Sequence, residues 1–211
     1  MNIQSLFVAA ALAAAIAAPS HAQSPFYVVG GVGTARHSID TGAINSQLIN
    51  LGFTGAATTS SNDDTAYRLG AGWYATPNLA VEASYFNLGK PDFSATATRS
   101  GTFGASLKTS GFAIDLVPQM QFANGVGING RLGYARTETK ANFSASGAFR
   151  LDSSSSKERR GGWDAGVGVS YALSRNVTVR AEWTRFMNIG GDQVGGKYDA
   201  DVYVASVLWR F

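Results

Sequence analysis

Apolar and polar residues alternate with a period of two along most of the chain, which is the pattern of β-strands with two different faces. The last ten residues show it most clearly, because Tyr203, Ala205, Val207, Trp209 and Phe211 share one face that carries no charge. Reading the whole chain in this way predicts eight strands: Pro25 to Ala35, Thr65 to Ala75, Leu79 to Leu88, Leu107 to Val117, Val126 to Arg136, Gly162 to Ala172, Val177 to Phe186 and Val202 to Phe211.

Seven of these strands have one face that carries no charge. In the first strand, the pattern does not show which face is the apolar one. In the second strand, Leu69 and Trp73 alternate with Arg68, and the later strands repeat this contrast. In the first strand, Phe26 and Val28 compete with the opposite parity, Tyr27 and Val29, for the apolar face. The pattern therefore places the first strand without orienting it.

The predicted connections alternate between short and long. The short ones are 76–78, 119–125 and 173–176, and the long, polar ones are 37–64, 89–106, 137–161 and 187–200. A barrel inserted from the periplasm has tight periplasmic turns and long outer loops. The alternation predicts an antiparallel up-and-down barrel with an even number of strands and both termini on the periplasmic side.

Aromatic residues support a barrel that crosses a membrane. If the strands alternate in direction, two rings form, an outer one of Tyr67, Tyr85, Tyr134, Trp163, Trp183 and Tyr203 and an inner one of Trp73, Tyr171, Trp209 and Phe211. Such rings mark the two interfaces of transmembrane barrels.

A soluble barrel or sandwich, with the apolar face turned inward, is the rival interpretation. Alternation alone does not say which face points out. The charged face, however, also carries many Gly, Ala and Ser residues, which suit a crowded lumen better than a solvated surface. The sequence therefore favours an all-β, eight-stranded transmembrane β-barrel.

Residues 1–22 have the features of a secretory signal peptide, and residues 23–211 form the predicted barrel. An apolar run from Leu6 to Ala18 is followed by Ser20 and Ala22, small residues at the positions that a signal peptidase reads. A membrane-spanning helix is the alternative, but the run is shorter than the roughly 20 residues that a span needs. Export and a transmembrane barrel together predict the bacterial outer membrane, and a formal net charge of +3 gives no reason to expect a nucleic-acid partner.

The stretch from Tyr67 to Gly89 resembles the OmpA-like transmembrane domain and related small outer-membrane barrels. The resemblance implies that Glu82 occupies an acidic position in the lumen. It also implies that the C-terminal strand is an assembly signal for the barrel assembly machinery, with the residues Tyr203, Val207, Trp209 and Phe211. OmpA relatives continue into a periplasmic domain that binds peptidoglycan, whereas this chain stops on its last strand, so a cell-wall tether is not implied.

The charged face predicts a network in the lumen, made of Arg68, Glu82, Asp115, Arg131, Asp164, Arg180, Glu182 and Arg210. Four basic and four acidic residues are the balance expected if they pair with one another, because unpaired buried charges are costly. A structural plug is the simpler interpretation, since an eight-stranded barrel has room only for side chains. The alternative is a narrow, low-conductance ion path in which Glu82 and an Arg form a switchable pair.

Enzymatic function, such as modification of lipid A, has less support. After cleavage of the signal peptide the only histidine is His37, followed by Ser38 and Asp40, and adjacency in a loop is not a catalytic arrangement. No cofactor or metal motif is present, and the glycines of 30–33 lie inside a strand with no helix after them.

The expected role is structural and surface-interacting, with outer-membrane lipid and lipopolysaccharide as surroundings. Long outer loops on a rigid barrel are where binding to extracellular ligands would occur. Ser153 to Ser156, followed by the charged run 157–160, reads as an exposed loop tip whose basic residues could contact lipopolysaccharide phosphates.

Overall fold

The computed structural model of the protein describes residues 24–37, 57–60, 63–90, 92–97, 101–145, 155–191 and 196–211. The predicted signal peptide, Ser38 and Asp40 lie outside these residues. Within them, no helix is long and apolar enough to cross a membrane.

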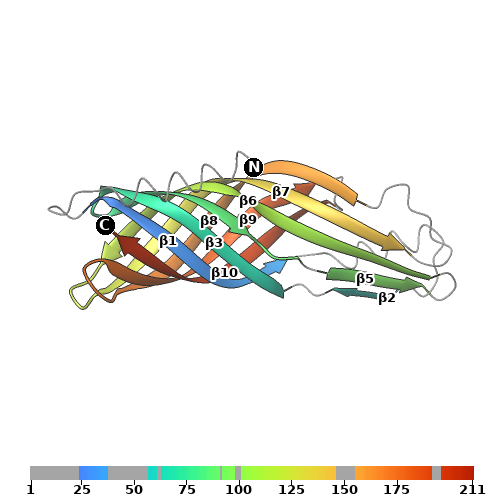
Figure 1. The fold of residues 1–211 in the computed structure, drawn as a ribbon, viewed down its shortest axis with the longest axis horizontal. Helices are drawn as coiled ribbons and strands as arrows, with labels where there is room; N and C mark the ends of the chain where they lie inside the picture. The colour runs from blue at the N-terminus through green and yellow to red at the C-terminus, as the bar shows by residue number, and fades with distance from the viewer. Residues whose placement is uncertain are drawn as a thin grey trace.

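Ten antiparallel strands form one sheet in the described residues (Figure 1). They are β1 (Phe26–His37), β2 (Ala57–Ser60), β3 (Asp63–Thr76), β4 (Leu79–Asn87), β5 (Asp92–Ala97), β6 (Gly101–Gln121), β7 (Val126–Ala145), β8 (Ser155–Ala172), β9 (Val177–Gly191) and β10 (Gly196–Arg210). Eight of them close into a barrel, because β1 pairs with β10 and β6 pairs with β7. The other two, β2 and β5, pair with each other and extend the sheet from β6. The predicted eight-stranded barrel is confirmed.

The apolar face of the strands points outward. Ile114, Trp163 and Val167 are each about 60% exposed, whereas Glu82, Asp115 and Asp164 are completely buried inside the barrel. A soluble barrel would show the reverse arrangement, so the rival interpretation is wrong. The outward face is apolar because it contacts lipid, and the inner face holds the polar side chains.

The first strand, which the sequence could not orient, follows the same rule. Tyr27 and Val29 point into the lumen and are buried, whereas Phe26 and Val32 point out. The seam with β10 fixes this choice, since β1 pairs with β10 from Tyr27 opposite Arg210 to His37 opposite Ala200. Beside this seam the lumen is largely apolar, because Val202 and Leu208 of β10 are buried there.

At the end of the barrel opposite the C-terminus, the strands reach further than the sequence predicted. Much of the expected loops 89–106, 137–161 and 187–200 belongs to β5 to β10. The run 157–160 was expected in a loop tip and instead lies in β8, paired with β7. The sequence predicted loops here because the alternating Thr, Lys and Asn residues have no apolar face. These parts of the strands lie beyond the membrane, so they do not need one. In Figure 1 these extensions and β2 and β5 lie at the end of the barrel opposite the C-terminus.

The three connections predicted to be short are tight turns. The turn after β6 closes with a hydrogen bond from the Gly125 amide to the carbonyl of Phe122, and Gly125 takes the positive φ of 82° that favours glycine. The turn from β3 to β4 is held against β6, because the Asn78 side chain donates to the carbonyl of Gln119 (3.1 Å).

Candidate functional site

Seven of the eight charged residues predicted for the lumen lie inside the barrel. They come from six strands and are all buried: Arg68 on β3, Glu82 on β4, Asp115 on β6, Arg131 on β7, Asp164 on β8, and Arg180 and Glu182 on β9. Because inward positions recur at every second residue, six strands can aim these side chains at one level of the lumen.

Arg131 lies at the centre of this arrangement. Its Nη2 donates to Glu82 Oε2 (2.6 Å) and Glu182 Oε1 (3.2 Å), and its Nη1 donates to Asp115. One guanidinium therefore joins three carboxylates from three other strands. Its planar fork of donors suits this better than a lysine would.

Glu82 is the second branching point. Its Oε1 accepts hydrogen bonds from the Tyr27 hydroxyl (2.6 Å) and from Arg180 Nη2 (2.8 Å). Arg180 Nε also lies 3.1 Å from Glu182 Oε2, which closes a ring of ion pairs. We call Tyr27, Glu82, Asp115, Asn129, Arg131, Arg180 and Glu182 the lumen network.

Two members of the lumen network were missed from the sequence. Tyr27 belongs to the first strand, which the sequence could not orient. Val29 lies on the same inward face, and it was the only sign in the sequence that this face could be buried. Asn129 donates to Glu182 Oε1 (2.8 Å) from the same inward face of β7 as Arg131. Neutral hydrogen-bond partners carry no charge pattern that would single them out.

Asp164 lies beside the network without joining it. Asp115 and Asp164 both stand opposite Gly133 of β7, on either side of it. A side chain at position 133 would clash, because its Cβ would lie 2.0 Å from Asp115 Oδ1. Among the described residues, no amide, hydroxyl or guanidinium group donates to either oxygen of Asp164, and its closest polar neighbour is the carboxyl group of Asp115.

The two remaining arginines predicted for the lumen, Arg68 and Arg210, each contact an aromatic ring. Arg68 is buried with its guanidinium carbon 5.9 Å from the centre of the Phe186 ring. Arg210 was expected in the network, but it lies at the periplasmic mouth, 4.9 Å from the Tyr74 ring, and its Nε donates to the carbonyl of Ser24 (2.9 Å). Its position at the end of β10 is too far down the barrel to reach the central acids.

Apolar clusters close the lumen on both sides of the network. On the extracellular side the rings of Phe86 and Phe186 lie 4.6 Å apart and pack with Leu88 and Ile189. On the periplasmic side Leu208 packs with a second cluster, whose other members are Tyr27, Val29, Ala80 and Val117. The lumen is therefore a charged layer between two apolar layers.

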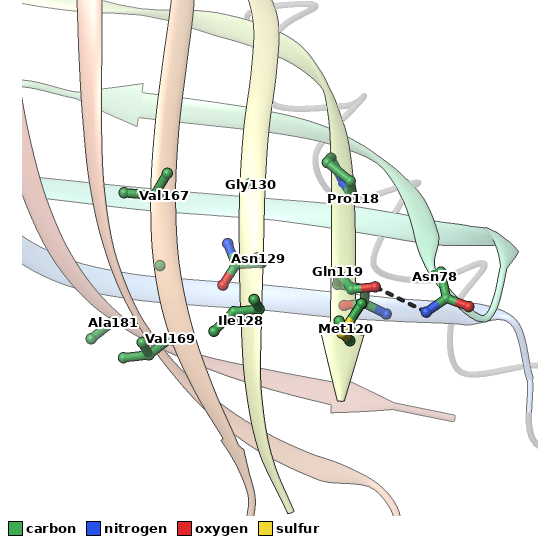
Figure 2. A pocket seen from close by; sticks show the side chains of 11 residues that line it. Asn78, Pro118, Gln119, Met120, Ile128, Asn129, Gly130, Val167, Val169 and Ala181 are labelled. Atoms are coloured by element: carbon green, nitrogen blue, oxygen red, sulfur yellow. Dashed lines mark hydrogen bonds between the residues drawn. The ribbon is translucent and has the colours of Figure 1, made fainter. Parts of the chain in front are cut away.

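Two cavities lie next to these layers. A polar vestibule of about 780 Å³ opens at the end of the barrel that holds Arg210. It is lined by Tyr74, Arg175 and Arg210, among others, and it reaches Tyr27 and Leu208 of the apolar layer. A groove of about 950 Å³ runs over Gly130 on β6 to β8, where Figure 2 shows Pro118, Ile128 and Val167 around it. Its apolar lining belongs to the outward face, so the groove is part of the lipid-facing wall.

His37, the candidate catalytic histidine, lies above the outer aromatic ring and is buried. Its Nε2 lies 3.0 Å from the carbonyl of Leu88 and must donate to it, and its ring centre lies 5.7 Å from that of Tyr198. Burial lowers the pKa of His37 below its ordinary value, and the contact with Leu88 only partly offsets this.

The residues of the predicted assembly signal lie along the C-terminal strand, β10, and at the residue that follows it. Tyr203, Val207 and Trp209 are each about half exposed on the outward face of β10. The carbonyl of Phe211 accepts a hydrogen bond from the amide of Ser24 (2.8 Å), which joins the two ends of the barrel wall.

The sequence matches the model of a known domain family, described as the outer membrane protein beta-barrel domain, over residues 6–211. No curated protein sequence matches the chain.

Solved structures of outer-membrane barrels share the fold. Neisserial surface protein A aligns with a TM-score of 0.54 at 16% identity, covering 90% of this chain and 100% of its own. The outer membrane protein OprG from Pseudomonas aeruginosa aligns with a TM-score of 0.54 at 15% identity, covering 90% of this chain and 97% of its own. At this identity the likeness establishes the architecture alone.

Proposed function

The chain belongs to the outer membrane protein beta-barrel domain family, and on this basis we propose that it is a structural and surface-interaction protein with a closed lumen. It resides in the bacterial outer membrane. The single observation that supports the closed lumen best is its layered filling, with the lumen network between two apolar clusters. An eight-stranded barrel has an interior that side chains can fill completely, and buried side chains at three successive levels of this barrel support such filling.

The extracellular strand extensions support a role at the cell surface. From Tyr134 of the outer aromatic ring, β7 continues to Ala145, which is on the order of 35 Å of extended strand. Backbone pairing with β6 and β8 continues along this extension, so it offers a firmer platform than a free loop. Binding sites are commonly carried by such projections from a rigid scaffold.

A non-enzymatic role fits the surroundings of the only histidine in the described residues. A catalytic base needs a nucleophile and an orienting group within hydrogen-bond reach. The Nε2 of His37 is instead engaged by a backbone carbonyl, and the ring is buried. This arrangement favours a structural histidine.

We further propose that the C-terminal strand is delivered to the barrel assembly machinery, with Tyr203, Val207, Trp209 and Phe211 as the residues read. Three of them form a continuous apolar ridge on the outside of the closing strand. Outer-membrane lipid, including lipopolysaccharide, surrounds the folded barrel.

The competing function is a narrow ion channel, and planar bilayer recordings of the purified full-length protein separate the two. A plugged lumen predicts rare openings of low conductance in the wild type. Glu82→Ala removes the acid that joins Arg131, Arg180 and Tyr27, so single-channel conductance should rise severalfold. Glu138→Ala, on the outer wall, is the matched control and should leave conductance at the wild-type value. Steady wild-type conductance, or a Glu82→Ala variant that conducts like the wild type, would contradict the plug.

A further inference from the structure

Positive charge gathers on the outward face of three adjacent strands, directly above the outer aromatic ring. We call this the wall cluster, and its members are Lys108 of β6, Arg136, Glu138 and Lys140 of β7, and Lys157 and Arg159 of β8. Five cations surround one acid. All of them share the outward parity of Tyr134 and Trp163, which lie just below them on the same strands.

The strand register stacks the wall cluster in rows that rise from the membrane. Ile114, Tyr134 and Trp163 form the apolar row. The next row brings Arg136 beside Phe112, and the row after it pairs Glu138 with Arg159. Above them, three lysines stand directly opposite one another across three strands: Lys108, Lys140 and Lys157.

A row of three lysines is unfavourable in an isolated protein, because like charges directly opposite on a sheet destabilise it. Glu138 offsets part of this repulsion, with Oε2 2.9 Å from both Lys157 Nζ and Arg159 Nε, and Oε1 3.4 Å from Lys140 Nζ. Among the described residues, Lys108 and Arg136 form no ion pair. Four positive charges are therefore left for an anion from outside the chain.

A surface pocket lies within the wall cluster. It measures about 490 Å³. Its lining includes the aromatic residues Tyr85 and Phe112, four cations of the wall cluster and the acid Glu138; the cations are Lys108, Arg136, Lys140 and Arg159. Aromatic and cationic residues together suit an amphipathic anion whose charged part lies at the membrane surface. Lys and Arg bind phosphate oxygens through charge-assisted hydrogen bonds.

The opposite wall at the same height has no such excess. Arg36 pairs with Asp63 (3.1 Å), and Arg185 lies 3.2 Å from Asp199 and 3.8 Å from Asp201. With Lys197 of β10 included, three cations face three acids there. A general need for charge at the membrane surface would not produce this difference between the two walls.

We propose that the wall cluster is a docking site for one lipopolysaccharide molecule of the outer leaflet. Its headgroup phosphates bind Arg136, Arg159 and the lysine row, and its acyl chains lie along the apolar wall below. The inference rests on the proposed placement of this end of the barrel at the cell surface. Lipopolysaccharide is the outer-leaflet lipid whose phosphates lie just above the acyl chains, at the height of Arg136 in this barrel.

The test measures binding of deep-rough lipopolysaccharide to the refolded full-length protein in a neutral detergent by native mass spectrometry. Lys108→Gln/Arg136→Gln removes two cations without touching the ion pairs of Glu138, and affinity should fall at least fivefold. Arg36→Gln/Arg185→Gln removes two cations from the opposite wall and should change affinity less than twofold. Lys108→Arg/Arg136→Lys keeps the charge and should retain binding.

Three results would overturn the proposal. One is an equal loss in the two double variants, and another is undiminished binding of the same lipopolysaccharide after chemical dephosphorylation. The third is binding of heparin at the same affinity, which would assign the cluster to a soluble polyanion. Channel recordings are independent of all three, so a failure here is distinguishable from a failure of the closed-lumen proposal.

Discussion

The lumen network and the wall cluster use the same charged residue types and place them in opposite surroundings. In the lumen, Arg131 and Arg180 satisfy acids of the same chain away from water. On the wall, only three of the five cations pair with the single acid Glu138, and all five stay open to solvent. Buried ions must be neutralised internally because desolvation is costly, whereas exposed ions remain available to an external partner. The comparison separates charge that holds the fold from charge that can bind.

The strongest test of this difference uses two arginines of the same strand. Arg131→Ala leaves three buried acids without their shared cation and should lower the free energy of unfolding by about 3 to 5 kcal/mol. Arg136→Ala, five residues further along β7 and exposed, should change it by less than about 0.5 kcal/mol. Urea unfolding in phospholipid vesicles, followed by tryptophan fluorescence, measures both. Similar losses in the two variants would show that burial is not what distinguishes the clusters.

In a second test, a substitution inside the lumen is expected to raise the free energy of unfolding, whereas Arg131→Ala lowers it. Asp164 is buried beside the carboxyl group of Asp115, and no cationic or amide donor of the described residues reaches it. Asp164→Asn replaces one of two adjacent acids by an amide that can donate to Asp115, so it should stabilise the barrel by about 1 kcal/mol. Asp199→Asn removes an acid that pairs with Arg185 outside the membrane and should cost less than about 1 kcal/mol. The same unfolding assay applies, and a destabilised Asp164→Asn variant would mean that this carboxylate is needed by Arg68 or Arg131.

The smallest expected effect concerns pH and the wall cluster. Partial burial alone would raise the pKa of Glu138, but hydrogen bonds from Lys157 and Arg159 hold the pKa at about 2. Because this value lies below the ordinary one, the contribution of Glu138 to stability is present above about pH 4.5 and is lost as the pH falls toward 2. Over that range the wild type should lose less than about 1 kcal/mol more than Glu138→Gln. If the free energies of unfolding of the wild type and of Glu138→Gln changed equally with pH, Glu138 would make no such contribution.

The ends of the strands could be predicted from the sequence only inside the membrane, where contact with lipid requires alternating apolar residues. Within the membrane, every outward position must be apolar, so Ile114 and Val167 revealed their strands. Beyond the outer aromatic ring, the Thr, Lys and Asn residues of β7 alternate without an apolar face, although they pair with β6 and β8. The basic run in β8 therefore looked like a loop tip. Cross-strand pairing, which sequence periodicity does not report, turned it into part of a wall.

The sequence by itself determined the class, the eight strands of the barrel and the inward parity of its charges. These follow from a local constraint, because each residue of a membrane strand faces either lipid or lumen. The tertiary structure alone decided the orientation of the first strand, the partners of Arg131, the exclusion of Arg210 from the network and the lysine row on the outer wall. These depend on the register between strands far apart in the chain, and that register is set only when the barrel closes.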